Sequence, residues 1–134
     1  MESEPYTKNV HHGPLVLRIA LGLLFIIPGL SKLANPGMII GMLRELGFPA
    51  AAFLGWILLL SEIIFGAAVL AGYKIRTTVW PLAIIMVIAG VTVAIPQIGS
   101  NPMAVPMTLF HLVALAGLVS LYFTGPGAHA VKEN

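Results

Sequence analysis

The sequence has no cysteine and very little charge. Without cysteine there is no disulfide, no thiolate nucleophile and no cysteine-ligated metal cluster. Only 9% of the 134 residues are Asp, Glu, Lys or Arg, whereas soluble domains carry roughly 25%. The few charges include no basic run that could bind nucleic acid. The composition therefore argues against a soluble enzyme, and its 58% hydrophobic content argues against a disordered chain.

The hydrophobic residues are concentrated in four long runs. A transmembrane helix needs about 20 mostly apolar residues to cross the hydrocarbon core. The candidate runs cover residues 15–33, 51–71, 79–98 and 105–123, and Gly, Pro and Asn residues separate them. We predict an all-α integral membrane protein, with residues 1–134 forming a single domain that contains a four-transmembrane-helix bundle.

A shorter amphipathic segment lies between the first two runs. Residues 37–46 place Arg44 and Glu45 on a polar side, which is typical of a short helix lying in the membrane interface. At the N-terminus, Glu2 and Glu4 stand where a cleavable signal would have positive charge. We therefore expect the N-terminal segment to be retained.

The distribution of Lys and Arg predicts the orientation in the membrane. Cytoplasmic flanks are enriched in positive charge. One side of the predicted bundle holds Lys8, Arg18, Lys74, Arg76 and Lys132, and the other holds Lys32 and Arg44. We predict a multi-pass protein of a prokaryotic cytoplasmic membrane, with both termini in the cytoplasm.

Small residues recur at helical spacing on the first two predicted helices. Membrane helices associate through small residues that let their backbones approach closely. The first stripe consists of Arg18, Gly22, Phe25, Gly29 and Lys32, and the second of Gly55, Leu59, Glu62 and Gly66. We predict that the two helices pack together, with Gly22, Gly29, Gly55 and Gly66 at the contacts.

Glu62 is the strongest candidate for a functional residue. An ionisable side chain near the middle of a membrane helix is costly and usually faces the bundle interior. Arg18, on the facing stripe, is its predicted partner, although the two lie at different depths. The pair is either a structural link between helices or a site that handles protons or ligand, and the third alternative is that Glu62 lies in a solvated cavity.

Three further polar residues are predicted in the other half of the bundle. Lys32, Gln97 and His111 fall at comparable depths, and together they could form a polar pocket for the carbonyl or hydroxyl head group of a ligand such as quinone. The simpler alternatives are a lysine that extends to the interface and a histidine bonded to a neighbouring carbonyl. With no Cys and only four His, we expect no metal or haem site.

The order and spacing of these residues resemble the DoxX family of small four-helix membrane proteins. The motifs are Arg18-x3-Gly22-x2-Phe25-x3-Gly29-x2-Lys32, Gly47-Phe48-Pro49-Ala50, Glu62 with Gly66 and Gly72, Arg76, and Gly125-Pro126-Gly127. The chain departs from the usual ending of that family, because Ala128, His129 and Ala130 follow. Family members resemble the DoxD-type membrane subunit of thiosulfate:quinone oxidoreductase, so the resemblance implies proximity to quinone.

Three functions remain open from the sequence. The first is an accessory subunit that anchors a membrane oxidoreductase or respiratory complex, associates with quinone and is not catalytic alone. The second is a small proton-coupled transporter that uses Glu62. The third is a structural or assembly scaffold. Expected partners are the lipid bilayer, redox protein subunits and further copies of the chain in a homo-oligomer, and no nucleic acid is expected.

Overall fold

The computed structural model describes residues 12–127 and residue 130, and the described part is helical without strands. Four helices are long and apolar enough to cross a membrane. They are α1 (His12–Ala34), α3 (Ala51–Ala71), the helix that begins as α4 (Ile75–Ala89), and α5 (Ala104–Thr124). The prediction of an all-α, four-helix membrane protein is confirmed.

A short α-helix and two turns of other helical geometry complete the fold. Helix α2 (Pro36–Glu45) occupies the segment where an interfacial helix is predicted. Helix α4 continues into a π-helical turn, η2 (Gly90–Ala94), and a 3-10 turn, η3 (Ile95–Gln97). Helix α4 also begins earlier than its apolar pattern indicates, because the backbone N–H groups of Thr77 and Thr78 donate to the carbonyl of Lys74.

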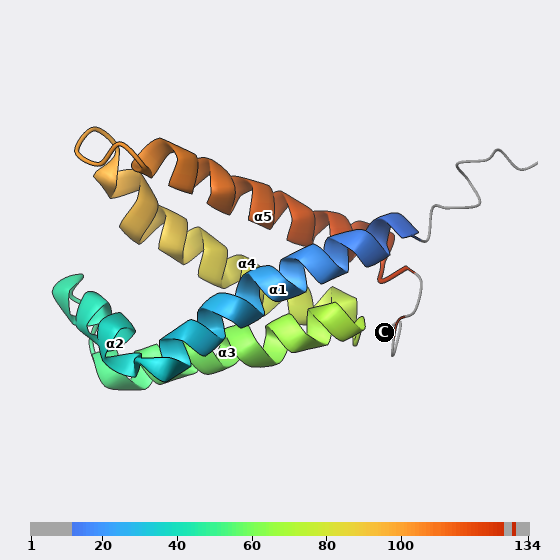
Figure 1. The fold of residues 1–134 in the computed structure, drawn as a ribbon, viewed down its shortest axis with the longest axis horizontal. Helices are drawn as coiled ribbons and strands as arrows, with labels where there is room; N and C mark the ends of the chain where they lie inside the picture. The colour runs from blue at the N-terminus through green and yellow to red at the C-terminus, as the bar shows by residue number, and fades with distance from the viewer. Residues whose placement is uncertain (1–11, 128–129, 131–134) are drawn as a thin grey trace, which may run out of the picture.

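The long helices form two antiparallel hairpins that diverge along the bundle (Figure 1). One hairpin pairs α1 with α3 and carries α2, and the other pairs α4 with α5. We call the end where α1 starts and α5 finishes the terminal end, and the opposite end the loop end. The hairpins meet at the terminal end and separate toward the loop end.

The hydrophobic core explains this divergence. Its buried members come from the terminal half and the middle of each long helix: Leu21, Phe25, Val69, Ile75, Val79, Leu82, Ala83, Met86, Ala114, Leu118 and Leu121. Toward the loop end, η2 and η3 contact α4 and α5, whereas α2 packs on α3 and α1. The bundle therefore has a shared core in one half and two separate walls in the other.

Glycines allow α1 and α3 to pack closely. A Cβ atom on Gly22 would lie 2.7 Å from Cβ of Leu70, and one on Gly29 would lie 2.7 Å from Cγ1 of Ile63. A Cβ on Gly66 would lie 3.1 Å from side-chain atoms of α1. Gly55 instead faces α2, where its Cβ would lie 2.8 Å from Cγ1 of Ile40. Three of the four glycines thus lie between α1 and α3, as predicted, and the fourth, Gly55, lies against α2.

Candidate functional site

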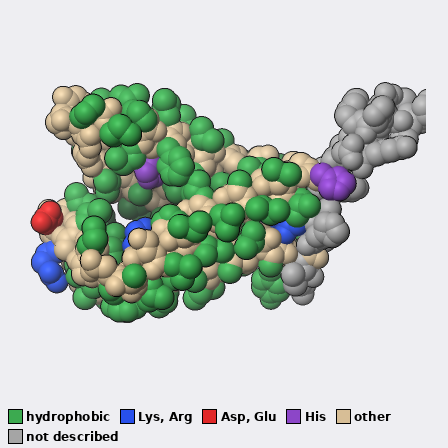
Figure 2. Space-filling view, in the orientation of Figure 1, with side chains coloured by type: hydrophobic (Ala, Val, Ile, Leu, Met, Phe, Trp, Pro, Cys, Tyr) green, Lys and Arg blue, Asp and Glu red, His purple; other side chains and the backbone are tan. Residues whose placement is uncertain are grey.

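A cleft opens between the two hairpins at the loop end (Figure 2). Its volume is about 230 Å³, and one wall comes from α2 and the other from η2 and η3. The lining residues are Met42, Glu45, Leu46, Thr92, Val93, Pro96 and Gln97. Figure 2 shows one basic side chain and one histidine beside the hollow. An apolar cleft with a few polar groups is typical of a small-molecule site.

The distorted end of α4 supplies the polar wall of this cleft. Pro96 has no N–H to donate within the helix, and the chain here changes from α to π and 3-10 geometry. The Gln97 amide nitrogen donates to the carbonyl of Val93 at 2.9 Å, and its oxygen accepts from Asn101 at 2.7 Å. An amide nitrogen carries two hydrogens, so Gln97 has a second donor for a ligand carbonyl.

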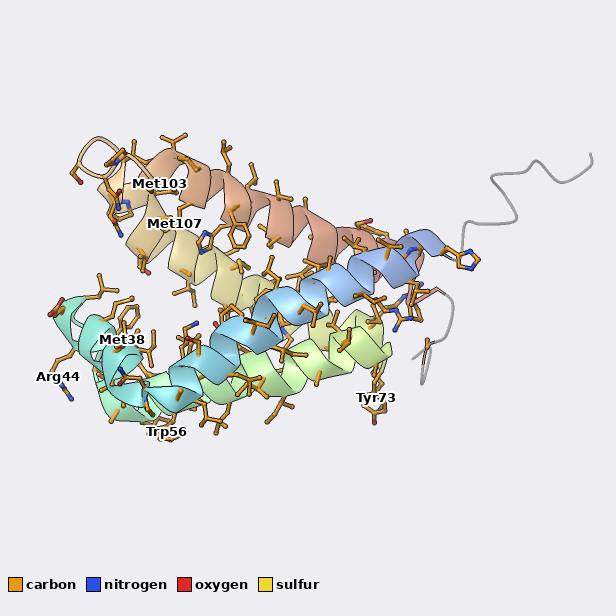
Figure 3. All side chains as sticks on the ribbon, in the orientation of Figure 1. Met38, Arg44, Trp56, Tyr73, Met103 and Met107 are labelled. Atoms are coloured by element: carbon orange, nitrogen blue, oxygen red, sulfur yellow. The ribbon has the colours of Figure 1, made fainter. Side chains whose placement is uncertain are left out.

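The other polar residues of the cleft offer different chemistry. The Thr92 hydroxyl donates to the carbonyl of Ile88 at 2.7 Å, which leaves its oxygen as an acceptor. Glu45 is exposed at the end of α2, next to Arg44. Figure 3 shows that Arg44 points away from the bundle. The wall thus combines one amide donor, one hydroxyl acceptor and one carboxylate.

Glu62 is paired with Lys32, which corrects the predicted pairing with Arg18. The Lys32 ammonium donates to both carboxylate oxygens of Glu62 at 2.8 Å. The Glu62 side chain is 7% exposed and the Lys32 side chain 28%. Helical side chains point toward the N-terminus of their own helix, so on antiparallel helices these two point toward each other. Gly29 lets α3 approach at this level, since its Cβ would lie 3.3 Å from Cβ of Glu62.

Arg18 points the opposite way and joins three segments at the terminal end. Its Nε donates to the carbonyl of Pro126 at 2.7 Å, and its Nη1 donates to the carbonyl of Leu70 at 2.9 Å. Leu70 lies in the last turn of α3, where carbonyls lack helical partners. The side chain is 1% exposed. Arg18 therefore caps α3 and fixes the chain after α5.

Gly72 makes room for this capping. Its φ of +77° is the left-handed conformation that ends a helix, and the N–H of Tyr73 donates to the carbonyl of Ala68 at 2.8 Å. A Cβ on Gly72 would also meet Nη1 of Arg18. The conformation and the neighbouring guanidinium both favour glycine at this position.

The predicted trio of Lys32, Gln97 and His111 is only partly assembled. Gln97 lines the cleft, whereas Lys32 binds Glu62. His111 Nδ1 lies 2.7 Å from the carbonyl of Met107, and its ring lies edge-on to Phe110. Within the described residues, no group of three His, Cys, Asp or Glu could hold a metal ion. Lys8 and Lys132, which belong to the predicted cytoplasmic charges, and His129, which follows the Gly125-Pro126-Gly127 motif, lie outside the described residues.

Sequence reasoning missed part of the cleft wall. Met42, Glu45 and Leu46 lie in the segment predicted as an interfacial helix, and that pattern does not indicate that the segment faces the end of α4. Pro96, six residues after Gly90 in an apolar run, is the sequence signal for a distorted helix end. The position of α2 opposite that end depends on the Ile40 contact with Gly55, which no local pattern encodes.

Comparison with known protein families identifies the family of this chain. The DoxX family model matches residues 13–95, which run from α1 through the π-helical turn of α4. Curated proteins and solved structures gave no significant match. The matched part includes Arg18, Lys32 and Glu62, together with both walls of the cleft up to Ile95. This multi-pass membrane protein belongs to the DoxX family.

Proposed function

We propose that this protein is an accessory subunit of a membrane oxidoreductase and that the loop-end cleft receives the head group of a quinone. The cleft carries this proposal because it combines apolar walls with the free hydrogen of the Gln97 amide. A quinone ring presents carbonyl acceptors, and its isoprenoid tail can extend into lipid between the diverging hairpins. The residues fit the head group in size and hydrogen bonding.

The chain's own residues would bind and orient the ligand. Gln97 would donate to one carbonyl, and Val93 and Pro96 would contact the ring from the α4 side. Met42 and Leu46 would contact it from α2. A bound quinone would supply the electron and proton acceptor, and a partner subunit would supply the electrons, because cofactors carry redox chemistry while proteins position them.

Features of the whole chain favour the same role. Most of the described residues lie in four helices that are long and apolar enough to cross a membrane, which suits a subunit that anchors or completes another protein. The proposed location is a prokaryotic cytoplasmic membrane, with the terminal end in the cytoplasm, where Lys74 and Arg76 lie. Homo-oligomers through the lipid-facing helix surfaces are compatible with this role.

The test is mass spectrometry of the protein extracted from its native membrane in mild detergent. We expect a redox polypeptide and quinone to co-purify in stoichiometric amounts. Gln97→Leu should lower quinone retention by roughly 3- to 10-fold, the effect of one lost hydrogen bond. Ser100→Ala is the matched control, because it removes a hydrogen bond to the backbone carbonyl of Gln97 and leaves the side-chain amide of Gln97 intact.

The outcomes separate the two parts of the proposal. Recovery of a redox partner without quinone would keep the anchoring role and refute the ligand. Purified protein that carries neither would refute both. Wild-type retention by Gln97→Leu would show that the quinone binds elsewhere.

A structural scaffold is the second candidate function, and the Lys32–Glu62 pair favours it. Both Glu62 oxygens are bonded to a cation of the same chain, which joins α1 to α3 without any ligand. Proton-coupled transport by Glu62 would require this pair to open during each cycle. Proton release from purified protein on addition of substrate would support transport over scaffolding.

A further inference from the structure

The three polar side chains that line the loop-end cleft determine which ligand oxygens it can bind. They are Glu45, Thr92 and Gln97, and the other lining residues are apolar. A hydrogen bond needs one donor and one acceptor, so a ligand must supply whichever of the two the cleft lacks. The hydrogen bonds already made within the protein show what each of the three side chains still offers.

The Gln97 amide offers one hydrogen, and the loop before α5 fixes its direction. The backbone N–H of Met103 donates to Oδ1 of Asn101 at 2.9 Å, so the Asn101 side-chain nitrogen is directed to Gln97 and donates to its Oε1 at 2.7 Å. Nε2 of Gln97 therefore faces the carbonyl of Val93, at 2.9 Å, and uses one of its two hydrogens there. Asn101 is thus a positioning residue for the one hydrogen that Gln97 offers a ligand.

Thr92 and Glu45 offer acceptors alone. The Thr92 hydroxyl has a single hydrogen, which it donates to the carbonyl of Ile88 at 2.7 Å. Because a carbonyl can only accept, this bond leaves Thr92 with lone pairs and no hydrogen for a ligand. An ionised Glu45 carboxylate likewise only accepts. Among these lining side chains, two therefore accept without donating, and one donates.

We infer that the cleft binds the reduced, hydroxyl-bearing hydroquinone form of its ligand in preference to the oxidised quinone, and that Thr92 accepts the hydroxyl hydrogen. This inference rests on the proposed quinone site. The two oxygens of a quinone only accept, so they can bond to Gln97 but have no hydrogen for the Thr92 oxygen. One hydroxyl of a hydroquinone can donate to Thr92 while the oxygen of the other accepts from Gln97.

The preference changes the reduction potential of the bound ligand. Tighter binding of the reduced form raises the potential of the bound couple, by about 30 mV for each tenfold ratio of affinities. The bound ligand then accepts electrons from a partner subunit more readily than the same ligand dissolved in the bilayer. The cleft would therefore serve a complex that reduces quinone.

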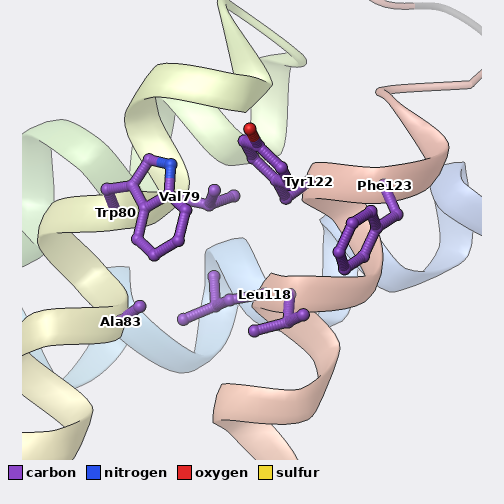
Figure 4. A pocket seen from close by; sticks show the side chains of 7 residues that line it. Val79, Trp80, Ala83, Leu118, Tyr122 and Phe123 are labelled. Carbon is purple, nitrogen blue, oxygen red and sulfur yellow. The ribbon is translucent and has the colours of Figure 1, made fainter.

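A second hollow, at the terminal end between α4 and α5, is the other place where an aromatic ring could bind. Its volume is about 80 Å³, against about 230 Å³ for the cleft. Figure 4 shows Trp80 and Tyr122 on its border. Both side chains carry a hydrogen-bond donor, so this hollow offers donors to a quinone carbonyl where the cleft offers mainly acceptors. Val119 also lines it, and replacement by phenylalanine should fill it.

The test compares the two redox forms of one small ligand on the purified full-length protein. Duroquinone and durohydroquinone are titrated separately into the detergent-solubilised protein under anaerobic conditions, and isothermal titration calorimetry gives each Kd. We expect durohydroquinone to bind roughly 3- to 10-fold more tightly, the effect of one additional hydrogen bond. Thr92→Val keeps the side-chain shape and removes the acceptor, so it should abolish this preference with little effect on the Kd of duroquinone.

Two control variants should retain the preference. Thr108→Val removes a hydroxyl that makes the same kind of bond on α5, to the carbonyl of Ala104 at 2.8 Å, but lies outside the cleft lining. Val119→Phe fills the terminal hollow and leaves the cleft intact. Loss of binding in Val119→Phe would show that the ligand occupies the terminal hollow and would overturn the inference.

The outcomes separate this inference from the proposed quinone site. Equal affinities, or tighter binding of duroquinone, would overturn the preference and leave the quinone site in place. Binding of neither form would refute the quinone site itself, and the preference with it. A preference that survives Thr92→Val would overturn the role of Thr92. The comparison on the wild-type protein needs no substitution, so it decides the preference even where Thr92→Val folds poorly.

Discussion

Four charged side chains lie in the described membrane-spanning helices, and the fold compensates in two ways the three that are not exposed, Arg18, Lys32 and Glu62. Glu62 is neutralised by Lys32 through two bonds of 2.8 Å. Arg18 is held by neutral carbonyls of Leu70 and Pro126. Removing one member of the first pair leaves a buried charge, whereas removing Arg18 leaves carbonyls without donors. The two kinds of variant should therefore behave differently.

A double-mutant cycle tests the Lys32–Glu62 pair. Lys32→Met or Glu62→Leu alone should each destabilise the protein by about 3 to 5 kcal/mol, because an uncompensated charge remains in an apolar environment. The double variant should recover most of that loss, measured by denaturant unfolding in detergent. The cycle of Arg18→Met with Glu62→Leu serves as the control and should be additive. Additive behaviour of the Lys32 cycle would contradict the pairing.

Arg18 should control the segment that follows α5. Arg18→Met should cost about 1 to 3 kcal/mol through two unsatisfied carbonyls and should speed hydrogen exchange around residues 125–127. Arg18→Lys should restore only part of the protection, since an ammonium lacks the rigid fork of donors. Arg44→Met, at an exposed position on α2, should change neither measurement. Unchanged exchange in Arg18→Met would refute the capping role.

The partner of Glu62 shows what helical spacing can and cannot predict. Arg18 and Lys32 share one stripe of α1, so the spacing correctly indicates that both face α3. The choice between them depends on side-chain direction. Lys32 points back toward the middle of the membrane and Glu62 points toward the loop end, whereas Arg18 points toward the terminal end. Helical side chains point toward the N-terminus of their own helix. Applied to two antiparallel helices, this rule favours Lys32 over Arg18 as the partner of Glu62 from the sequence alone.

At the scale of elements, close packing of α1 on α3 requires glycine at specific positions. Gly22→Ala should destabilise the protein by about 1 to 3 kcal/mol, because its Cβ would lie 2.7 Å from Cβ and 3.0 Å from Cα of Leu70. Gly13→Ala on the same helix is the matched control. Nothing lies within 4 Å of its Cβ, so it should be neutral or slightly stabilising. Thermal unfolding in detergent compares the two, and equal effects would contradict the close contact.

The elements differ in how far the sequence predicts them. The 51–71 run matches α3 because the run is continuously apolar and turns at Ala50 and Gly72 bound it on either side. The distorted end of α4 could not be predicted from hydropathy, since η2 and η3 are as apolar as the helix before them. There the geometry depends on Pro96 and on the Gln97 side chain, which bonds to the carbonyl of Val93.

At the scale of the whole molecule, one half of the bundle is packed and the other is divided. The four-helix count follows from composition and run length alone. The divergence does not, because it depends on which buried residues meet across the hairpins: the shared core extends from Ile75 to Met86 on α4 and stops before η2. The helices are therefore held together by Arg18 at the terminal end, whereas a cleft separates the two hairpins at the loop end.

This asymmetry predicts a difference in water access that the cysteine-free sequence makes easy to measure. Thr92→Cys places a thiol in the cleft wall. Leu109→Cys places one on the exposed surface of α5 at a comparable distance from the loop end. A thiol reacts with maleimide as its thiolate, which forms in a hydrated cleft and not in the hydrocarbon of the bilayer.

In sealed right-side-out vesicles, a membrane-impermeant maleimide should label Thr92→Cys at least about tenfold faster than Leu109→Cys, because only the first thiol is solvated as thiolate. Added quinone should slow the labelling of Thr92→Cys if it occupies the proposed site. Labelling confined to inverted vesicles would reverse the proposed orientation while keeping the cleft. Equal, slow labelling of both variants from either side would show that lipid fills the space between the hairpins, and the cleft would then be no route for a polar head group.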